Sequence, residues 1–177
     1  VRGAVGQETR YTSDSRGAVV SETDALGHTT AYAYTPEGWL SEIRKADGAL
    51  VSYTHDKTGQ VLSEEAAGES VQSTYNETGK LTLSRGPEGE TAYQYDGQGR
   101  LVSVTQPSGG TVGYGYDAYG RKTSFVYPDG GEATYAYDSL DRLVSVTGPE
   151  GETVSYAYDA AGNRTETRQA GLTTTYA

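Results

Sequence analysis

The sequence predicts an all-β fold, in which short hairpins follow one another as an antiparallel meander. Three observations support this prediction. A unit of about 21 residues recurs along the chain, apolar and polar residues alternate within each unit, and turn-forming residues stand at constant places. None of these patterns has the three-to-four-residue spacing of a helix.

Each repeat is marked by two tyrosines that are one residue apart. The two positions of this pair together hold 14 of the 16 tyrosines of the chain. The second position recurs every 20 or 21 residues, as Ser13, Tyr34, His55, Tyr75, Tyr95, Tyr116, Tyr137 and Tyr158. We therefore expect residues 1–177 to form one array of about eight repeats, taken from a longer chain.

The residues around each tyrosine pair indicate strands. In 111–116 (TVGYGY) and 153–158 (TVSYAY), larger residues alternate with small or polar ones, which is the periodicity of a strand. Eight units of two strands give about 16 strands joined by short turns. Open twisted sheets of more than about ten strands tend to curl, so we expect a curved ribbon.

The turn after the tyrosine pair has a clear residue pattern. Asp96 follows the pair, Gly99 stands three residues later, and Arg100 comes next. Aspartate begins a type I turn and glycine accepts positive φ, so this pattern predicts a three-residue loop with a glycine bulge. Asp141 replaces the glycine in one repeat, and aspartate also tolerates this conformation.

Opposite charges should therefore meet across the hairpin, between Asp96 and Arg100 and at the same positions of later repeats. The repeat positions that we expect to be structural are Tyr93, Tyr95, Asp96, Gly99, Arg100, Leu101, Tyr114, Tyr116, Asp117, Gly120, Arg121, Tyr135, Tyr137, Asp138, Arg142, Leu143, Tyr156, Tyr158, Asp159 and Gly162.

Strand alternation also predicts which side chains share a face. Tyr95 should face Leu101 and Tyr137 should face Leu143 on one side of the sheet. On the other side we expect Val102, Val104, Val144 and Val146. The tyrosine rows should interleave with aliphatic residues, because strands of one type lie about 9.6 Å apart, too far for rings to stack.

The second turn of the later repeats is Pro-x-Gly, at 87–89, 107–109, 128–130 and 149–151. Proline sets φ for the second turn position and removes an N–H that the strand ladder does not need.

Composition excludes several classes of protein. A net charge of −10 disfavours binding to nucleic acid or to anionic membranes, and no apolar run is long enough for a membrane span. The chain has no cysteine, which excludes disulfides and cysteine-ligated metal.

The iterated motif Y-x-Y-D-x-x-G-R-L, followed by Pro-x-Gly, resembles the YD repeat of the Rhs family. That family includes bacterial polymorphic toxins, the cocoons of Tc toxins, wall-associated proteins and teneurins. The match is strong at 93–101 and 135–143, and weaker in the opening repeats, where Thr35 replaces aspartate and Trp39 stands at the basic position.

The resemblance implies a curved ribbon that is part of a spiral shell, secreted or at the cell surface of bacteria. It implies a non-enzymatic segment that encapsulates a C-terminal toxin domain for delivery, with flanking repeats and that enclosed domain of the same polypeptide as partners. The family's aspartyl autoprotease region has no counterpart here, so no aspartate is assigned as catalytic.

Other chemistry finds little support in the residues. A calcium site needs six to eight oxygen ligands around one ion, whereas the repeat supplies one aspartate beside an arginine. Glu64 and Glu65 fall in an expected turn, and two separate histidines, His28 and His55, make no zinc site. We assign no catalytic residue, no cofactor and no metal, and predict that the segment is not an enzyme.

Tyrosine rows can stack on sugars, so an extracellular module that binds glycans or a cell-surface protein is the alternative function. The tyrosines occupy the mid-strand positions that packing needs, which favours the structural interpretation. The two end strands of such an array have unpaired edges, so we expect the segment to associate or to depend on flanking repeats.

Overall fold

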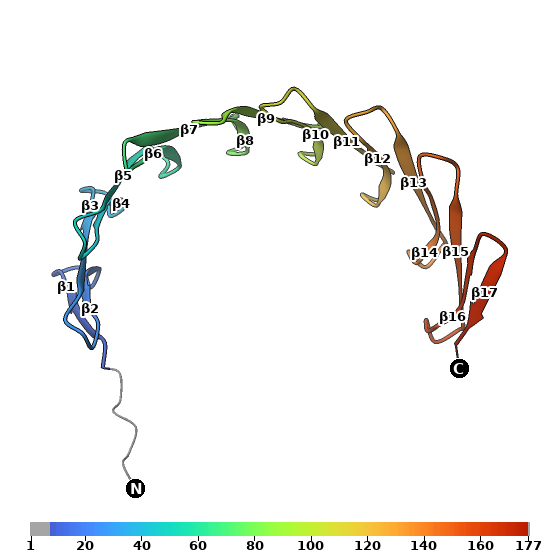
Figure 1. The fold of residues 1–177 in the computed structure, drawn as a ribbon, viewed down its shortest axis with the longest axis horizontal. Helices are drawn as coiled ribbons and strands as arrows, with labels where there is room; N and C mark the ends of the chain where they lie inside the picture. The colour runs from blue at the N-terminus through green and yellow to red at the C-terminus, as the bar shows by residue number, and fades with distance from the viewer. Residues whose placement is uncertain (1–7, 177) are drawn as a thin grey trace, which may run out of the picture. The chain divides into compact units, whose positions relative to one another are not determined.

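The structure, a computed structural model, describes residues 8–176 and confirms an all-β antiparallel meander (Figure 1). The described part contains 17 strands and no helix, against about 16 strands predicted. The strands are β1 (Arg10–Ser13), β2 (Val19–Thr23), β3 (Thr29–Tyr34), β4 (Leu40–Arg44), β5 (Leu50–His55), β6 (Val61–Ala66), β7 (Glu69–Tyr75), β8 (Leu81–Gly86), β9 (Gly89–Tyr95), β10 (Leu101–Thr105), β11 (Thr111–Tyr116), β12 (Lys122–Val126), β13 (Glu132–Tyr137), β14 (Leu143–Thr147), β15 (Thr153–Tyr158), β16 (Arg164–Gln169) and β17 (Leu172–Thr175).

The chain divides into two compact units, and the division falls within strand β9, between Glu90 and Thr91. In the first unit, each strand from β1 to β8 pairs antiparallel with the next. In the second unit, the same holds from β9 to β17. That residues 1–177 form one array of about eight repeats stays a prediction, and residues 1–7 and 177 lie outside the described part.

The loop that follows each tyrosine pair, here called the YD loop, has the geometry that its sequence predicts. In the loop 96–100, the N–H of Gly99 donates to the carbonyl of Asp96 and the N–H of Asp96 donates to the carbonyl of Arg100, both at 2.9 Å. Gly99 has φ of 76°, and Asp141, which takes the same place in a later repeat, has φ of 61°. Aspartate can therefore take the place of the loop glycine in this hairpin.

The loops at the other ends of the strands use a similar turn. Gly109, Gly130 and Gly151 of the Pro-x-Gly sequences have φ between 84° and 87°. The turn at Pro87 is shorter, and Gly89 already begins strand β9.

Two connections are tighter hairpins of a kind that the repeat pattern does not contain. Residues 67–68 and 170–171 form two-residue loops, and both residues of each loop have positive φ, as in a type I′ turn. The second of these loops leads into β17, the seventeenth strand.

Each YD hairpin contains a β-bulge near its loop, and the bulge corrects one prediction. Tyr95 lies opposite Leu101, as expected, but the register then shifts, so that Val104 lies opposite Tyr93. The same shift brings Val146 opposite Tyr135. Val104 and Val146 thus share the tyrosine face, and their predicted placement on the other face is wrong, because the extra residue inverts the alternation after it.

The two faces of the sheet carry different side chains. On the tyrosine face, Tyr135 lies opposite Val146, and on the other face Ala136 lies opposite Ser145. Tyrosines are thus interleaved with aliphatic residues. Among the described residues, only Ala133 is an apolar residue in a buried position, so the sheet is a single layer without a hydrophobic core.

The alanines of the type I′ loops should be replaceable with a gain in stability. Ala67 has φ of 53°, a region that costs an L-residue about 1–2 kcal/mol and that asparagine tolerates better. We expect Ala67→Asn to raise the free energy of unfolding by about 1 kcal/mol, measured from the urea denaturation midpoint. Ala25→Asn is the control, since Ala25 itself does not have positive φ; an equal gain there would contradict the explanation.

Candidate functional site

Arginines join consecutive hairpins in the second unit. The Nε of Arg100 donates to Oδ2 of Asp96 in its own loop at 2.6 Å, and Nη1 donates to the carbonyl of Asp117 in the next loop at 2.9 Å. The guanidinium carbon lies 4.8 Å from the ring centroid of Tyr116. One side chain thus contacts the acid of its own repeat and both the tyrosine and the backbone of the next.

The same set of contacts, here called the arginine link, recurs twice more. Arg121 reaches the carbonyl of Asp138 at 3.2 Å and lies 5.0 Å from the Tyr137 ring. Arg142 reaches the carbonyl of Asp159 at 3.0 Å and lies 4.9 Å from the Tyr158 ring. The predicted acid–base pairs are therefore present. The arginines of these pairs also contact the next hairpin, which was not predicted.

The aspartates of these loops are held as carboxylates. The backbone N–H of Arg100 donates to Asp96 and lowers its pKa, and Arg142 does the same for the pKa of Asp138. At Asp117, desolvation acts to raise the pKa, but the hydrogen bonds from Arg121 outweigh it. A carboxylate that accepts these hydrogen bonds and has a lowered pKa stays ionised, so it can hold the turn.

Tyrosines at the second position of the pair use the hydroxyl to bind the preceding hairpin. Tyr116 donates to the carbonyl of Leu101 at 2.9 Å, and Tyr158 donates to the carbonyl of Leu143 at 2.8 Å. Both acceptors begin the strand that follows the previous YD loop. These tyrosines therefore connect consecutive repeats.

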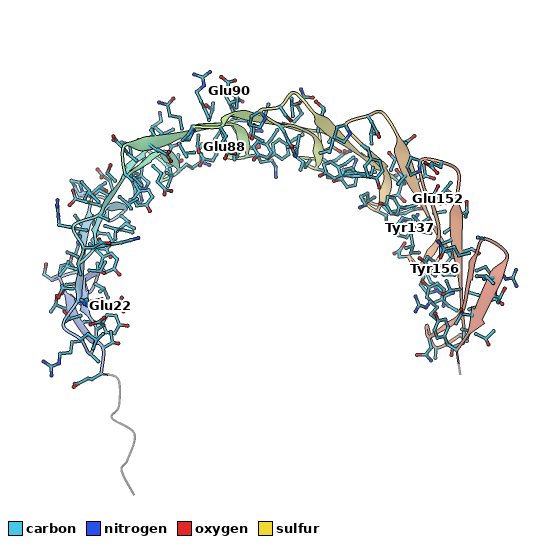
Figure 2. The ribbon with its side chains drawn as sticks, in the orientation of Figure 1. Glu22, Glu88, Glu90, Tyr137, Glu152 and Tyr156 are labelled. Carbon is cyan, nitrogen blue, oxygen red and sulfur yellow. The ribbon has the colours of Figure 1, made fainter. Side chains whose placement is uncertain are left out.

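Tyrosines at the first position of the pair contact other side chains on the tyrosine face. Tyr114 contacts Phe125 edge-on, with ring centroids 5.4 Å apart, and Lys122 lies 4.5 Å from the Tyr135 ring. Figure 2 shows Tyr137 and Tyr156 on the same side of the sheet in the second unit. Tyr114 and Tyr135 thus each contact a side chain of the neighbouring strand.

In the described part of the chain, the acidic and histidine side chains form no metal-binding cluster. Within residues 8–176, no three histidine, aspartate or glutamate residues gather as metal ligands. The ring of His28 contacts Asp24 at 2.9 Å within one loop, and Glu64 lies in strand β6 opposite Val71, not in the turn where it was expected.

The described part also contains no helix of the length and hydropathy that a membrane crossing requires.

The sequence reasoning missed a groove in the first unit. Trp39 stands at the basic position that arginine occupies in the links, and it faces His55, which occupies the second tyrosine position of the next repeat. The groove, here called the Trp39 groove, has a volume of about 540 Å³. It is lined by Thr35, Glu37, Trp39, Tyr53, Thr54, His55, Asp56 and Lys57. The sequence does contain a signal for this groove. Trp39 and His55 both depart from the repeat pattern, and they do so at the same junction between two repeats.

His55 has a buried ring nitrogen, Nδ1, that forms no hydrogen bond. Among the described residues, its Nδ1 is the only buried side-chain nitrogen or oxygen without a hydrogen-bond partner. A tyrosine in this position would place a hydroxyl near the preceding strand, as Tyr34 does when it donates to the carbonyl of Val19 at 2.8 Å.

Comparisons with known proteins agree with the repeat and the fold. The Teneurin YD-shell family matches residues 64–176, and the RHS Repeat family matches residues 14–50. No curated protein sequence matches the chain.

Several solved structures are similar in fold. The crystal structure of TcdB2-TccC3-Cdc42 superimposes with a TM-score of 0.72 at 20% identity, over 95% of this chain and 12% of that one. The crystal structure of TcdB2-TccC3 gives 0.57 at 25% identity, over 93% and 9%. A mutant Tc holotoxin pore of Photorhabdus luminescens gives 0.50 at 25% identity, over 94% and 9%. The chain therefore spans about a tenth of these structures' own chains.

The YD loop should tolerate asparagine better than alanine. Asn76 already begins such a loop, and its Oδ1 accepts the N–H groups of Thr78 and Lys80 at 3.0 Å. We expect Asp96→Asn to keep the two equivalent bonds and to lose the ion pair between the half-buried Asp96 and Arg100 side chains. Asp96→Ala loses both, so its urea midpoint should fall at least twice as far. Equal midpoints for the two variants would contradict this account.

His55→Tyr should stabilise the first unit. The change removes a buried ring nitrogen that has no hydrogen-bond partner, and it restores the tyrosine hydroxyl that is usual at this position of the repeat. We therefore expect a gain of about 1–3 kcal/mol in the free energy of unfolding, measured by urea denaturation. The reverse change, Tyr116→His, should lower it, because that hydroxyl bonds the carbonyl of Leu101. A loss of stability in His55→Tyr would show that the histidine is favoured by contacts that a tyrosine cannot make.

Proposed function

Because the chain belongs to the Teneurin YD-shell family, whose profile matches residues 64–176, we propose that it is a wall segment of an Rhs-type shell that encloses a C-terminal toxin domain of the same polypeptide. In this proposal the segment is not an enzyme, and the protein is secreted or displayed at the cell surface. Its partners are the flanking repeats and the enclosed domain.

One observation carries the proposal. Almost nothing in the described sheet is buried, and Ala133 alone is an apolar residue in a buried position. A globular domain gains its stability by covering one face of a sheet, whereas this sheet leaves both faces open. Such a layer is suited to separating two spaces, and the similarity to structures that contain TccC3 supports the same use.

The end strands support the expected contact with flanking repeats. In the described part, β1 pairs with β2 and β17 pairs with β16, so each has one edge without a ladder partner. An open edge favours the addition of another strand. In a longer array, the next repeat would supply that strand.

The test is protease protection in the full-length gene product. If the shell encloses a toxin domain, the segment that follows the repeats should resist protease while the shell is intact. Arg100→Ala combined with Arg121→Ala removes two arginine links, and should increase the cleavage rate of that segment several-fold. Arg168→Ala is the matched control, because Arg168 pairs with Glu166 of its own strand and links no repeats.

Two results would overturn the proposal. One is a gene product with no folded segment beyond the repeats. The other is a following segment that protease cleaves as fast in the intact protein as when it is produced without the repeats.

A further inference from the structure

The junction at Trp39 lacks the guanidinium that joins the later hairpins. At three of those junctions, an arginine Nη1 donates to the carbonyl of the first residue of the next YD loop, as Arg100 does to Asp117 at 2.9 Å. Here Trp39 stands at the arginine position, and the corresponding carbonyl is that of Asp56. Among the described residues, this carbonyl accepts the N–H of Gly59 at 3.2 Å, and no side chain donates to it. It can therefore accept a second hydrogen bond.

The space at this junction can hold a side chain from a partner. The Trp39 groove has a volume of about 540 Å³, within the range of about 300–1,000 Å³ that is usual for ligand sites. Its aromatic wall is the half-buried indole of Trp39, whose ring centroid lies 5.6 Å from that of His55. The indole also rests on Gly59, where a Cβ would lie 2.9 Å from it. These two contacts hold the indole in one place before a ligand binds, which reduces the entropy cost of binding.

The charged side chains at the groove favour a cation. Glu37 and Lys57 are exposed, and within residues 8–176 neither forms an ion pair. Oδ1 of Asp56 accepts the N–H groups of Thr58 and Gln60 at 2.7 and 3.0 Å, but Oδ2 has no hydrogen-bond partner among the described residues. The groove thus carries two carboxylates and one ammonium, on a chain of net charge −10. A positive ligand is therefore attracted and a negative one is repelled.

A guanidinium matches these groups better than an ammonium does. It is planar, so it can lie against an aromatic ring while its N–H groups bond two acceptors. The arginine links show this combination within the same chain. The guanidinium carbon of Arg142 lies 4.9 Å from the centroid of the Tyr158 ring, while its Nη1 donates to the carbonyl of Asp159 at 3.0 Å. An ammonium is a compact point charge without this geometry.

We propose that the Trp39 groove binds the arginine side chain of a polypeptide partner. The guanidinium lies against the indole and donates to the carbonyl of Asp56 and to the carboxylate of Glu37. Lys57 favours a polypeptide over a small guanidinium compound, because its ammonium can donate to a backbone carbonyl beside the arginine. With a small cation, Lys57 is only a repulsive like charge. The partner thus supplies the contact that an arginine of the chain itself makes at the later junctions.

The single tryptophan of the chain gives the test a local signal, because its emission reports on this groove. The intact chain is titrated with an acetylated and amidated Gly-Arg-Gly peptide, and in parallel with the matching Gly-Lys-Gly peptide and with butylguanidinium. We expect a saturable change in emission with the arginine peptide, and at least fivefold weaker affinity for the other two ligands.

Three results would contradict the proposal. No saturable change with the arginine peptide would overturn the site. Equal affinity for the lysine peptide would overturn the assignment of a guanidinium. Equal affinity for butylguanidinium would overturn the assignment of a polypeptide.

A pair of charge variants tests whether Glu37 is one of the acceptors. Glu37→Gln should weaken the arginine peptide about threefold, because it removes a carboxylate that the guanidinium bonds. Glu88→Gln is the matched control. It makes the same change at an exposed glutamate of the first unit, in the loop between β8 and β9, and should leave the affinity unchanged. An equal loss in both variants would indicate attraction to the net charge alone, and no loss in Glu37→Gln would overturn the placement of the guanidinium.

Trp39→Arg tests the same groove by filling it from within the chain. It installs the usual residue of the repeat, which should bond the carbonyl of Asp56 and so exclude the arginine peptide. Saturation-transfer NMR on the peptide should show at least a tenfold loss of affinity in Trp39→Arg and none in Glu88→Gln. Unchanged affinity in Trp39→Arg would overturn the proposal.

If Trp39→Arg does not fold, judged by its circular dichroism, the comparison of Glu37→Gln with Glu88→Gln decides. Neither protease protection nor enclosure enters these measurements, so their outcome is independent of the proposed shell function.

Discussion

The absence of a hydrophobic core is the constraint on which the rest of this structure depends. With Ala133 as the only buried apolar residue among those described, packing on the tyrosine face covers the other apolar side chains only in part. Bonds between each hairpin and the next therefore add to the stability, as in other repeat proteins. The tyrosine hydroxyl that reaches back to Leu101 and the arginine that reaches forward to Asp117 are those bonds. Because these bonds need a constant distance between hairpins, the spacing of the repeat varies less along the chain than its aliphatic residues do.

The sequence was sufficient for the fold because each element of the repeat has a local cause. Aspartate and glycine define the YD loop, and alternation defines the strands, so both could be predicted without tertiary information. The face of Val104 could not, because a bulge is a property of the paired strands and one extra residue reverses every later side chain. A turn was expected near Glu64 and Glu65, but its two-residue form at Ala67 and Gly68 was not, because alanine is an unusual residue at positive φ.

The candidate site was harder to predict than the fold, and the reason is physical. A repeat pattern directs attention to what recurs, whereas the Trp39 groove consists of what does not. Trp39 replaces an arginine, His55 replaces a tyrosine, and Gln60 is uncharged where an arginine would bond Oδ2 of Asp56. Each substitution alone looks like tolerated variation. Only the three-dimensional structure shows that Trp39, His55 and Asp56 border one concave surface.

A wall made of linked repeats can accommodate such a surface at little cost to its neighbours. Contacts in the array are limited to adjacent hairpins, so an altered junction affects the two hairpins beside it and few others. At the Trp39 junction, Trp39 contacts the ring of His55. At the corresponding junction of a later repeat, the guanidinium of Arg100 contacts the ring of Tyr116. Both contacts hold a side chain of one repeat against a ring of the next. The junction thus retains its link while it loses the ion pair. The chemical consequence is that Oδ2 of Asp56 has no hydrogen-bond partner among the described residues, whereas Oδ2 of Asp96 accepts from Arg100.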